Sequence, residues 1–310
     1  MKMFEQVGFR GKPTVLASWP GMGNAGLIAV DYLRRKLDAK IFAELDMSPF
    51  FIPDSIVVKD GIAQLPDIPT SIFYYATDPE LIIFESNAQV AGREAIIEIK
   101  AILDVIVQFP VARIFTFAAF AQPISYKAQS KVLLTCNSQK MMDELRDTGA
   151  SPMPDGYIAG QNGLLLGVAA SRQIDAACLL GTIPGYAANI SYPAASIELL
   201  KTISNILNYQ IDIAELEESK QEMDKQFELI EERIKEYIPN VNEEDETEEN
   251  KDQETEEEIV PHYIMEKIEK MFSDAAANRE KAAELKNELD RWKLFELYEN
   301  RFLDLFKDKK

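Results

Sequence analysis

The sequence has 310 residues, enough for one large domain or two smaller ones. Hydrophobic residues make up 46% of the chain and charged residues 27%, values that exclude wholesale disorder, collagen and a disulfide scaffold. The formal net charge of −19 disfavours binding of nucleic acid or of an anionic membrane surface by the whole chain. The start of the chain lacks the apolar core of a signal peptide, and no apolar run is long enough to span a membrane. We therefore expect a cytoplasmic protein.

In chain order, short apolar runs alternate with segments of helical periodicity. The expected strands are residues 13–19, 40–45, 55–58, 71–76, 81–85, 113–118, 132–136 and 176–180. The expected helices are residues 26–37, 92–109, 138–148, 163–170 and 194–207. Several strands are continuous apolar runs, which is typical of a sheet covered on both faces. The pattern predicts an α/β fold with a layered, mixed and mostly parallel sheet flanked by helices, in which 71–76 and 81–85 form an antiparallel hairpin.

The last third of the chain differs from the rest in its charge and in the spacing of its apolar residues. Residues 1–210 carry 20 acidic and 17 basic side chains, whereas residues 239–258 carry 11 and 1, a composition that predicts a disordered acidic linker. Two apolar seams flank this linker at heptad-like spacing. The first consists of Ile213, Leu216, Lys220, Met223, Phe227, Ile230, Ile234 and Tyr237, with Lys220 as its polar member. The second consists of Ile264, Ile268, Met271, Ala275, Ala282, Leu285, Leu289 and Trp292.

These boundaries predict four segments. They are a core domain (1–210), a heptad helix (211–238), the acidic linker (239–260) and a C-terminal helix (261–310). Each seam leaves an apolar stripe that must be covered. Pairing of the two helices with each other or with a neighbouring subunit is favoured over packing on the core, because 3.5-residue stepping suits helix-on-helix contact.

A glycine-rich turn separates the first expected strand from the first helix. Gly21, Gly23, Asn24 and Gly26 lie in the turn, and its glycines match the spacing G-x-G-x-x-G. In a dinucleotide site, such a loop brings backbone N–H groups to a pyrophosphate at the helix N-terminus. The alternative is a tight turn that packs the helix on the sheet, and it is the favoured interpretation.

Two further motifs are candidates for a ligand site or for tight turns. The first is Gly160-Gln161-Asn162-Gly163, in which Asn162 could cap the following helix. The second contains Pro184, Gly185 and Tyr186, which are expected to follow a core strand at its carboxyl end. Ligands of open α/β sheets gather at such strand ends.

The core offers no strong catalytic constellation. The single histidine, His262, lies beside the acidic linker, which excludes a Ser-His-Asp triad, a Cys-His pair and a histidine-based zinc site in the core. Cys136 and Cys178 lie in apolar stretches and are expected to be buried, reduced thiols. We predict no catalytic residue, no metal and no cofactor.

Taken together, the segments 19–26, 160–167 and 179–186 resemble, in order and spacing, the proteasome assembly chaperone family, specifically its archaeal and bacterial members. The resemblance covers about residues 10–210. It implies a fold like that of nucleoside phosphorylases and hydrolases without their catalytic residues. It also implies self-association or pairing with a paralogue, and help in assembling or binding proteasome α-subunit rings.

Some members of that family end in a hydrophobic–Tyr–any tripeptide that docks on the ring. This sequence ends Asp308-Lys309-Lys310, and a similar triplet, Leu297-Tyr298-Glu299, is internal. Docking by that route is therefore not expected.

The leading interpretation is a non-enzymatic assembly or interaction protein that forms homo-oligomers through its α/β core and contacts a partner with its helical arm. The implied partner is a proteasome α-subunit or another protein client. One alternative is a small-molecule binding protein or enzyme that uses residues 21–26, with a nucleoside- or phosphate-type ligand, or a carboxylate–amine ligase of ATP-grasp type. Another is a coiled-coil adaptor whose core only oligomerises.

Overall fold

The computed structural model describes residues 1–51 and 55–237, and single positions beyond them. These positions are Ile268, Met271, Phe272, Ala275, Lys281, Ala282, Leu285, Lys286, Leu289 and Phe302. The chain divides into two compact units, Met1–Val241 and Asn242–Lys310.

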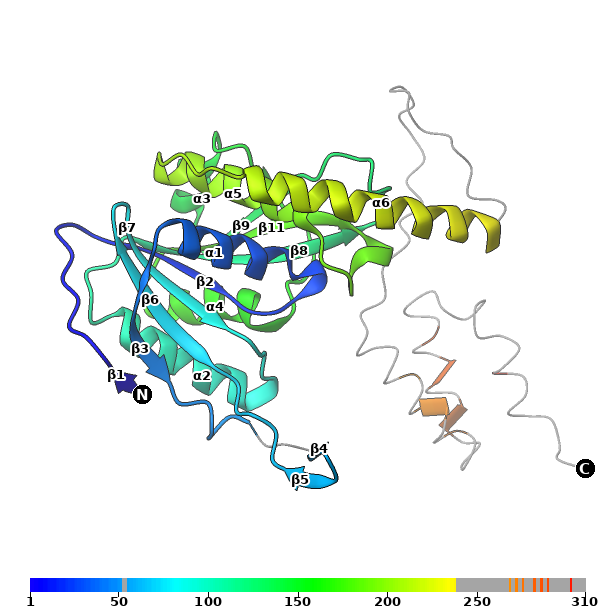
Figure 1. Ribbon diagram of the computed structural model, residues 1–310, viewed down its shortest axis with the longest axis horizontal. Coiled ribbons are helices and arrows are strands. Elements are labelled where there is room, and N and C mark those ends of the chain that lie inside the picture. Colours follow the sequence, from blue (N-terminus) through cyan, green and yellow to red (C-terminus); the bar gives the residue numbers. More distant parts are fainter. Residues whose placement is uncertain are drawn as a thin grey trace, which may run out of the picture. The chain divides into compact units, whose positions relative to one another are not determined.

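A mixed sheet forms the centre of the first unit (Figure 1), and the described residues contribute nine strands to it. In spatial order these are β1 (Lys2–Met3), β3 (Lys40–Leu45), β6 (Ser71–Thr77), β7 (Glu80–Ser86), β2 (Thr14–Ser18), β8 (Arg113–Gln122), β11 (Ala176–Pro184), β9 (Val132–Cys136) and β10 (Ser151–Pro152). The four central strands β7, β2, β8 and β11 run parallel to one another. β6 and β7 form the antiparallel hairpin that the sequence predicted.

Helices cover both faces of this sheet, which confirms the layered α/β architecture. α2 (Gly92–Ile106) and α4 (Gly160–Ser171) pack on one face, where their apolar side chains join one buried cluster. α1 (Ala25–Lys36), α3 (Gln139–Leu145), α5 (Pro193–Leu207) and α6 (Ala214–Tyr237) lie on the other face (Figure 1). Central strands such as β2 are buried on both sides because both layers press on them. Within the described part of the chain, no helix combines the length and apolar character needed to cross a bilayer.

Several element boundaries differ from the sequence prediction by a few residues, and two of these differences fall in the candidate motifs. β11 continues to Pro184 instead of ending at residue 180, since Gly181–Pro184 extend the parallel ladder with Ala119–Gln122 of β8. α4 begins at Gly160, three residues earlier than expected, and Asn162 is inside the helix. The N-cap residue is Ala159, which makes no side-chain cap bond, so the prediction that Asn162 caps this helix is wrong.

The seam of α6 packs on the chain's own core. Leu216 and Phe227 are buried in the same apolar cluster as α1 and α5, and Ile213, Met223 and Ile230 are partly buried against it. For these residues the favoured prediction, pairing with the second helix or with another subunit, is therefore wrong. The apolar stripe of α6 is covered here by α5 and by a set of tyrosines, which form a complementary apolar surface within the same unit.

The second unit contains an apolar cluster of its own. Seven described residues are buried in it, with Met271 packed against them: Ile268, Phe272, Ala275, Ala282, Leu285, Leu289 and Phe302. Most of them are positions of the second predicted seam. The predicted linker at 239–260, and the seam positions Ile264 and Trp292, lie outside the described residues.

Candidate functional site

The three sequence motifs meet near one edge of the sheet, where the parallel strands β2, β7, β8 and β11 all end. In open α/β sheets this is the edge at which ligands bind. The glycine turn follows β2 and starts α1, and Pro184 ends β11. The strand order therefore brings the glycine turn and Pro184 together, and the side chain of Gln89, which donates to the carbonyl of Pro20, lies beside Gly160.

Backbone hydrogen bonds hold the glycine turn closed. The N–H of Gly23 donates to the carbonyl of Ala188 at 2.7 Å, and its carbonyl accepts from the N–H of Tyr192 at 2.9 Å. The N–H of Asn24 donates to the carbonyl of Gly21 at 2.9 Å. Gly23 and Asn24 both adopt left-handed backbone angles, with φ of 59° and 47°. Because the N–H groups of Gly23 and Asn24 already have partners, neither is free to bind a phosphate.

Gly26 serves close packing between helix and sheet. It is buried in the first turn of α1, and a Cβ atom built on it would overlap the carbonyl oxygen of Phe117 in β8. Only glycine therefore allows α1 to approach the sheet this closely. This contact favours the structural interpretation of the turn over the ligand interpretation.

Gln161 and Asn162 belong to a buried polar cluster under the same edge. The side chain of Gln161 donates to Glu98 of α2 at 2.6 Å and accepts from the backbone N–H of Val90 at 3.0 Å. Glu98 is fully buried, and this burial raises the pKa of its carboxyl group. The backbone carbonyl of Asn162 accepts from the Thr116 hydroxyl at 3.0 Å. These residues tie α2, α4 and β8 together.

Gly163 also serves packing, because a Cβ atom built on it would overlap the carbonyl oxygen of Ile158.

Glu98 was not among the residues predicted from the sequence, although its place in the helical pattern is a signal. Its position falls between Ala95 and Ile102 on the apolar stripe of its helix, where a charged residue is unusual.

Tyr186 anchors α6. Its hydroxyl donates to Glu231 of α6 at 2.5 Å and accepts from the backbone N–H of Tyr126 at 3.0 Å. Glu231 also accepts from the Ser125 hydroxyl at 3.0 Å. Burial, reinforced by the neighbouring Glu231 carboxylate, raises the pKa of Tyr186. Gly185 starts the short turn that carries Tyr186. The third motif therefore docks a helix in this structure.

Two cavities share Asn24 at this edge of the sheet. One, of about 350 Å³, is lined by Pro20, Gly21, Gly23, Asn24, Ala188, Asn189 and Ile190. The other, of about 330 Å³, is lined by polar and apolar residues of α1, β6, β7 and the adjoining loops, among them Asp31, Tyr74 and Glu85. Glu85 lines the second cavity, and Nε of Arg34 lies 3.0 and 2.9 Å from its two carboxylate oxygens. The Arg34 guanidinium also stacks on Tyr74, 4.6 Å from the ring centroid.

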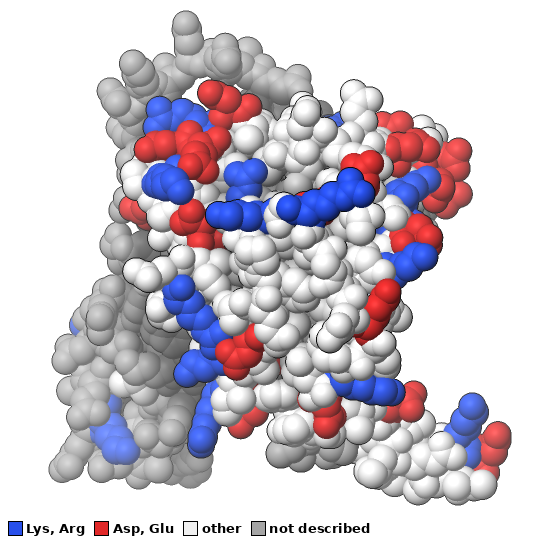
Figure 2. Space-filling model, turned by 90° about the vertical axis from the view of Figure 1, so that its left-hand side faces the viewer, with Lys and Arg blue, Asp and Glu red and all other residues white. Residues whose placement is uncertain are grey.

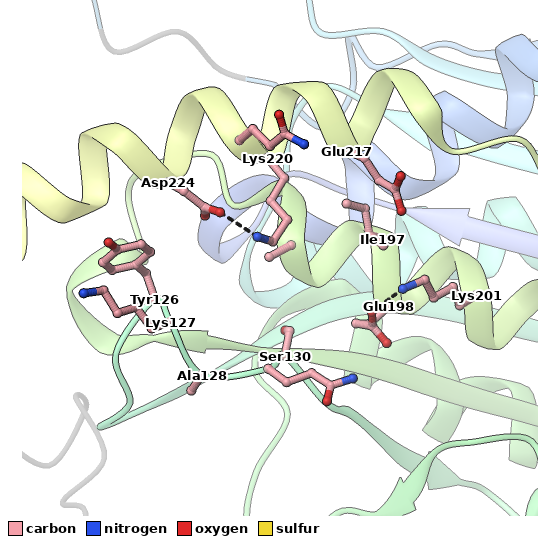
Figure 3. A pocket seen from close by; sticks show the side chains of 13 residues that line it. Tyr126, Lys127, Ala128, Ser130, Ile197, Glu198, Lys201, Glu217, Lys220 and Asp224 are labelled. Atoms are coloured by element: carbon pink, nitrogen blue, oxygen red, sulfur yellow. Dashed lines mark hydrogen bonds and ion pairs between the residues drawn. The ribbon is translucent and has the colours of Figure 1, made fainter.

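A third cavity, of about 620 Å³, lies between α5, α6 and the loop 125–130 (Figure 3). Lys220, the polar member of the first seam, points into it and pairs with Asp224 at 2.5 Å, and Lys201 pairs with Glu198 on α5 at 2.8 Å. Lys127 and Glu217 also line it. This lining offers ion pairs and hydrogen bonds to a polar partner.

Among the described residues, no group of three histidine, cysteine, aspartate or glutamate side chains is arranged to hold a metal ion.

Glu85 predicts a pH-dependent contribution to stability. Burial raises the pKa of this carboxyl group to about 7, against the opposing effect of Arg34. Between about pH 4.5 and 7 the folded protein therefore holds a proton that the unfolded chain releases, so the free energy of unfolding falls as pH rises through this range. Across this pH range, the melting temperature of Glu85→Gln should decrease less than the melting temperature of wild type. The exposed control Glu94→Gln should follow wild type, and identical slopes for wild type and Glu85→Gln would contradict the prediction.

Both cysteines are free thiols, but only Cys178 is fully buried, and Cys136 is partly exposed, contrary to expectation. Burial raises the pKa of Cys136 to about 11 and that of Cys178 to about 12. Because the thiolate is the reactive species, labelling of the native protein at neutral pH should be slow at both sites. Mass spectrometry after timed exposure to a thiol reagent checks this, and fast modification of either residue would refute it.

Comparison with known proteins identifies the fold and the family. The sequence model of the PAC2 family matches residues 15–231. A search of curated proteins gave no significant match. The crystal structure of Pyrococcus furiosus PbaB, described as an archaeal proteasome activator, superposes with a TM-score of 0.64 at 25% sequence identity. That superposition covers 74% of this chain and 97% of PbaB.

Two further structures share the fold. Pyrococcus furiosus PbaA, described as an archaeal homolog of proteasome-assembly chaperone, has a TM-score of 0.59 and 20% identity, covering 75% of this chain and 93% of PbaA. A proteasome-assembly chaperone homologue of Mycobacterium tuberculosis has a TM-score of 0.58 and 19% identity, covering 74% and 97%. The chain therefore belongs to the PAC2 family, the proteasome assembly chaperone family that its motifs resemble.

Proposed function

We propose that this chain is a non-enzymatic protein-binding factor of the assembly-chaperone type, with proteasome α-subunits or another protein client as its partner. The observation that carries the proposal is the PAC2 match over residues 15–231, together with the likeness to PbaB over 97% of PbaB's length. PbaB is described as a proteasome activator, and PbaA as a homolog of a proteasome-assembly chaperone. A related role here requires surfaces that bind protein.

The use of the three motifs supports binding over catalysis. The glycine turn joins two loops through Gly23 and sets the distance between helix and sheet through Gly26, Gln161 ties α4 to α2, and Tyr186 holds α6. Each motif therefore stabilises the fold at the edge where an enzyme of this architecture would place reacting groups. The alternative, a nucleoside- or phosphate-type ligand, would have to use the two cavities that share Asn24.

The proposal includes self-association through the α/β core and a helical, coiled-coil-like arm in the second unit that contacts the partner. The apolar cluster of Ile268, Phe272 and Leu285 supports a folded helical element there. The free thiols of Cys136 and Cys178 suit a reducing compartment such as the cytoplasm.

The test is an assembly assay with purified proteasome α-subunits of the organism that encodes this chain. Native electrophoresis should show faster formation of α-rings, or a new complex, when the full chain is added. Bovine serum albumin at equal concentration serves as the control protein.

A thermal-shift screen with nucleosides, nucleotides and inorganic phosphate tests the alternative. A ligand that raises the melting temperature, combined with no effect on α-subunits, would replace the proposed function with small-molecule binding.

A further inference from the structure

The cavity of about 330 Å³ between α1, β6 and β7 is built from regular elements of the first unit (Figure 1). We call it the α1–β6–β7 cavity. It lies at the edge of the sheet where ligands of open α/β sheets bind. Its volume falls at the lower end of the range of about 300–1,000 Å³ that is typical of small-molecule sites. A helix and two paired strands hold the lining side chains more precisely than loops would.

Tyr74 places a buried hydroxyl group in the lining of this cavity. The residue is 9% exposed, and the Arg34 guanidinium stacks on its ring at 4.6 Å from the centroid. Among the described residues, the hydroxyl has no hydrogen-bond partner. Burial raises the pKa of Tyr74, so the hydroxyl keeps its proton at neutral pH and can donate it. A buried donor without a partner costs free energy, which an acceptor on a ligand would recover.

Glu85 supplies acceptor atoms in the same cavity. Its side chain is 12% exposed. Nε of Arg34 lies between the two carboxylate oxygens, at 3.0 and 2.9 Å, so each oxygen keeps a lone pair for another donor. Glu85 is the second-last residue of β7, which runs parallel to β2. In dinucleotide-binding α/β folds, an acidic side chain accepts a hydrogen bond from a ribose hydroxyl.

The charges around the cavity cancel, and this balance limits the class of ligand. The described lining contains the carboxylates of Asp31 and Glu85 and no lysine, arginine or histidine side chain. Arg34 pairs with both carboxylates, and Nε of Arg35 lies 2.9 Å from Asp31, so two bases neutralise two acids. A phosphate would meet the two carboxylates, and an ammonium group would find both of them already paired. These charges favour an uncharged ligand.

A hydroxyl group on a ligand meets both needs with one atom, because it can accept from Tyr74 and donate to Glu85. Further hydrogen bonds are offered by three polar side chains of the lining that have no partner among the described residues: Asn24, Thr70 and Ser191. Apolar side chains complete the wall and can contact the carbon skeleton of a ligand: Leu27, Ile28 and Ile72.

We propose that the α1–β6–β7 cavity binds a small uncharged polyol, a molecule with hydroxyl groups on neighbouring carbon atoms. The polyol is either a free sugar or the sugar of a nucleoside, which share this chemistry. Tyr74 donates to one of its hydroxyl groups, and Glu85 accepts from it. The inference goes beyond the proposed function, since a small-ligand site can exist on a protein that binds other proteins.

The test is saturation-transfer NMR of the full chain with D-ribose and with uridine, at pH 8, above the pKa of Glu85. Wild type should give a saturable signal. Tyr74→Phe removes one oxygen and keeps the ring that stacks on Arg34, so binding should weaken ~3- to 10-fold, as for one neutral hydrogen bond. Glu85→Gln should weaken binding ~10-fold or more, as for a hydrogen bond to a charged group. 2′-Deoxyuridine, which lacks one hydroxyl, should bind more weakly than uridine.

Tyr75→Phe is the matched control. Tyr75 is the next residue of β6, but it packs against the apolar cluster on the other face of the sheet, and its hydroxyl donates to Glu5 at 3.2 Å. This variant should bind the polyol as wild type does. Circular dichroism melts check that every variant remains folded.

The two ligands distinguish the sources of the polyol. Signal from ribose supports a site for the sugar alone, and signal from uridine only supports a site for a nucleoside. No saturable signal from either at millimolar concentration would overturn the inference, as would binding that Tyr74→Phe and Glu85→Gln leave unchanged.

Inorganic phosphate tests the charge argument. Figure 2 shows a row of lysine and arginine side chains on the surface of the first unit, to which an anion can be attracted without Tyr74. Phosphate should therefore leave the ribose and uridine signals unchanged. Displacement of either ligand by phosphate would overturn the assignment of an uncharged ligand. Binding of α-subunits is measured separately, so failure here does not affect the proposed function.

Discussion

Replacing Phe227 by alanine should lower the free energy of unfolding by about 3–5 kcal/mol, the range typical of a buried phenylalanine. Phe227 is 1% exposed, and its ring centroid lies 5.2 Å from that of Tyr192, 6.1 Å from that of Tyr186 and 6.2 Å from that of Tyr126. Its loss would open a cavity at the centre of the α6 contact. Amide hydrogen exchange along α6 should accelerate in the variant, and chemical denaturation gives the change in stability.

Leu229→Ala is the matched control for this variant. Leu229 lies on the same helix but is 59% exposed, so the free energy of unfolding should change by no more than about 0.5 kcal/mol. Equal, small effects of the two substitutions would mean that α6 does not dock on the core in solution. A fragment ending at Tyr209 would then fold with an unchanged melting transition.

Replacing Gly26 by alanine should destabilise the protein by more than about 4 kcal/mol, at the upper end of single substitutions. Alanine favours a helix by up to about 1 kcal/mol over glycine, so propensity alone predicts stabilisation. The added Cβ atom would however overlap the Phe117 carbonyl oxygen, a backbone group that cannot rotate away. The close contact between α1 and β8 therefore decides whether Gly26→Ala stabilises or destabilises the protein. Urea denaturation measures the change in the free energy of unfolding.

Gly167→Ala tests the same packing argument, because it should change the stability in the opposite direction. Gly167 lies inside α4, and a Cβ atom built on it meets nothing within 4 Å. This variant should be neutral or more stable than wild type. If Gly26→Ala keeps the wild-type stability but loses binding of a nucleoside or phosphate, the glycine turn is a ligand site and the packing account is wrong.

The layered sheet could be predicted because continuous apolar runs such as residues 113–118 require cover on both faces. The course of β11 past Gly181 could not, because it depends on pairing with β8, far away in the sequence. Glycine at 181 and proline at 184 are local signals for a strand end, and here tertiary pairing outweighs them.

The partner of α6 could not be predicted for a similar reason. Heptad spacing shows that a helix has an apolar stripe, but it does not identify the surface that covers the stripe. Here Tyr126, Tyr186 and Tyr192 come from separate loops and the start of α5 to surround Phe227. The function of the glycine turn was predictable only as two alternatives, and the closed backbone hydrogen bonds of Gly23 favour one of them.

We propose that this PAC2-family chain binds protein, with proteasome α-subunits as the first client to test. The most direct measurement is sedimentation velocity of the fluorescently labelled full chain mixed with purified α-subunits from the same organism. Our account predicts that the labelled chain co-sediments with the α-subunits, and that unlabelled chain competes for the same complex. Independent sedimentation of the two proteins at every concentration tested, with a nucleoside or phosphate raising the melting temperature of the chain, would contradict it.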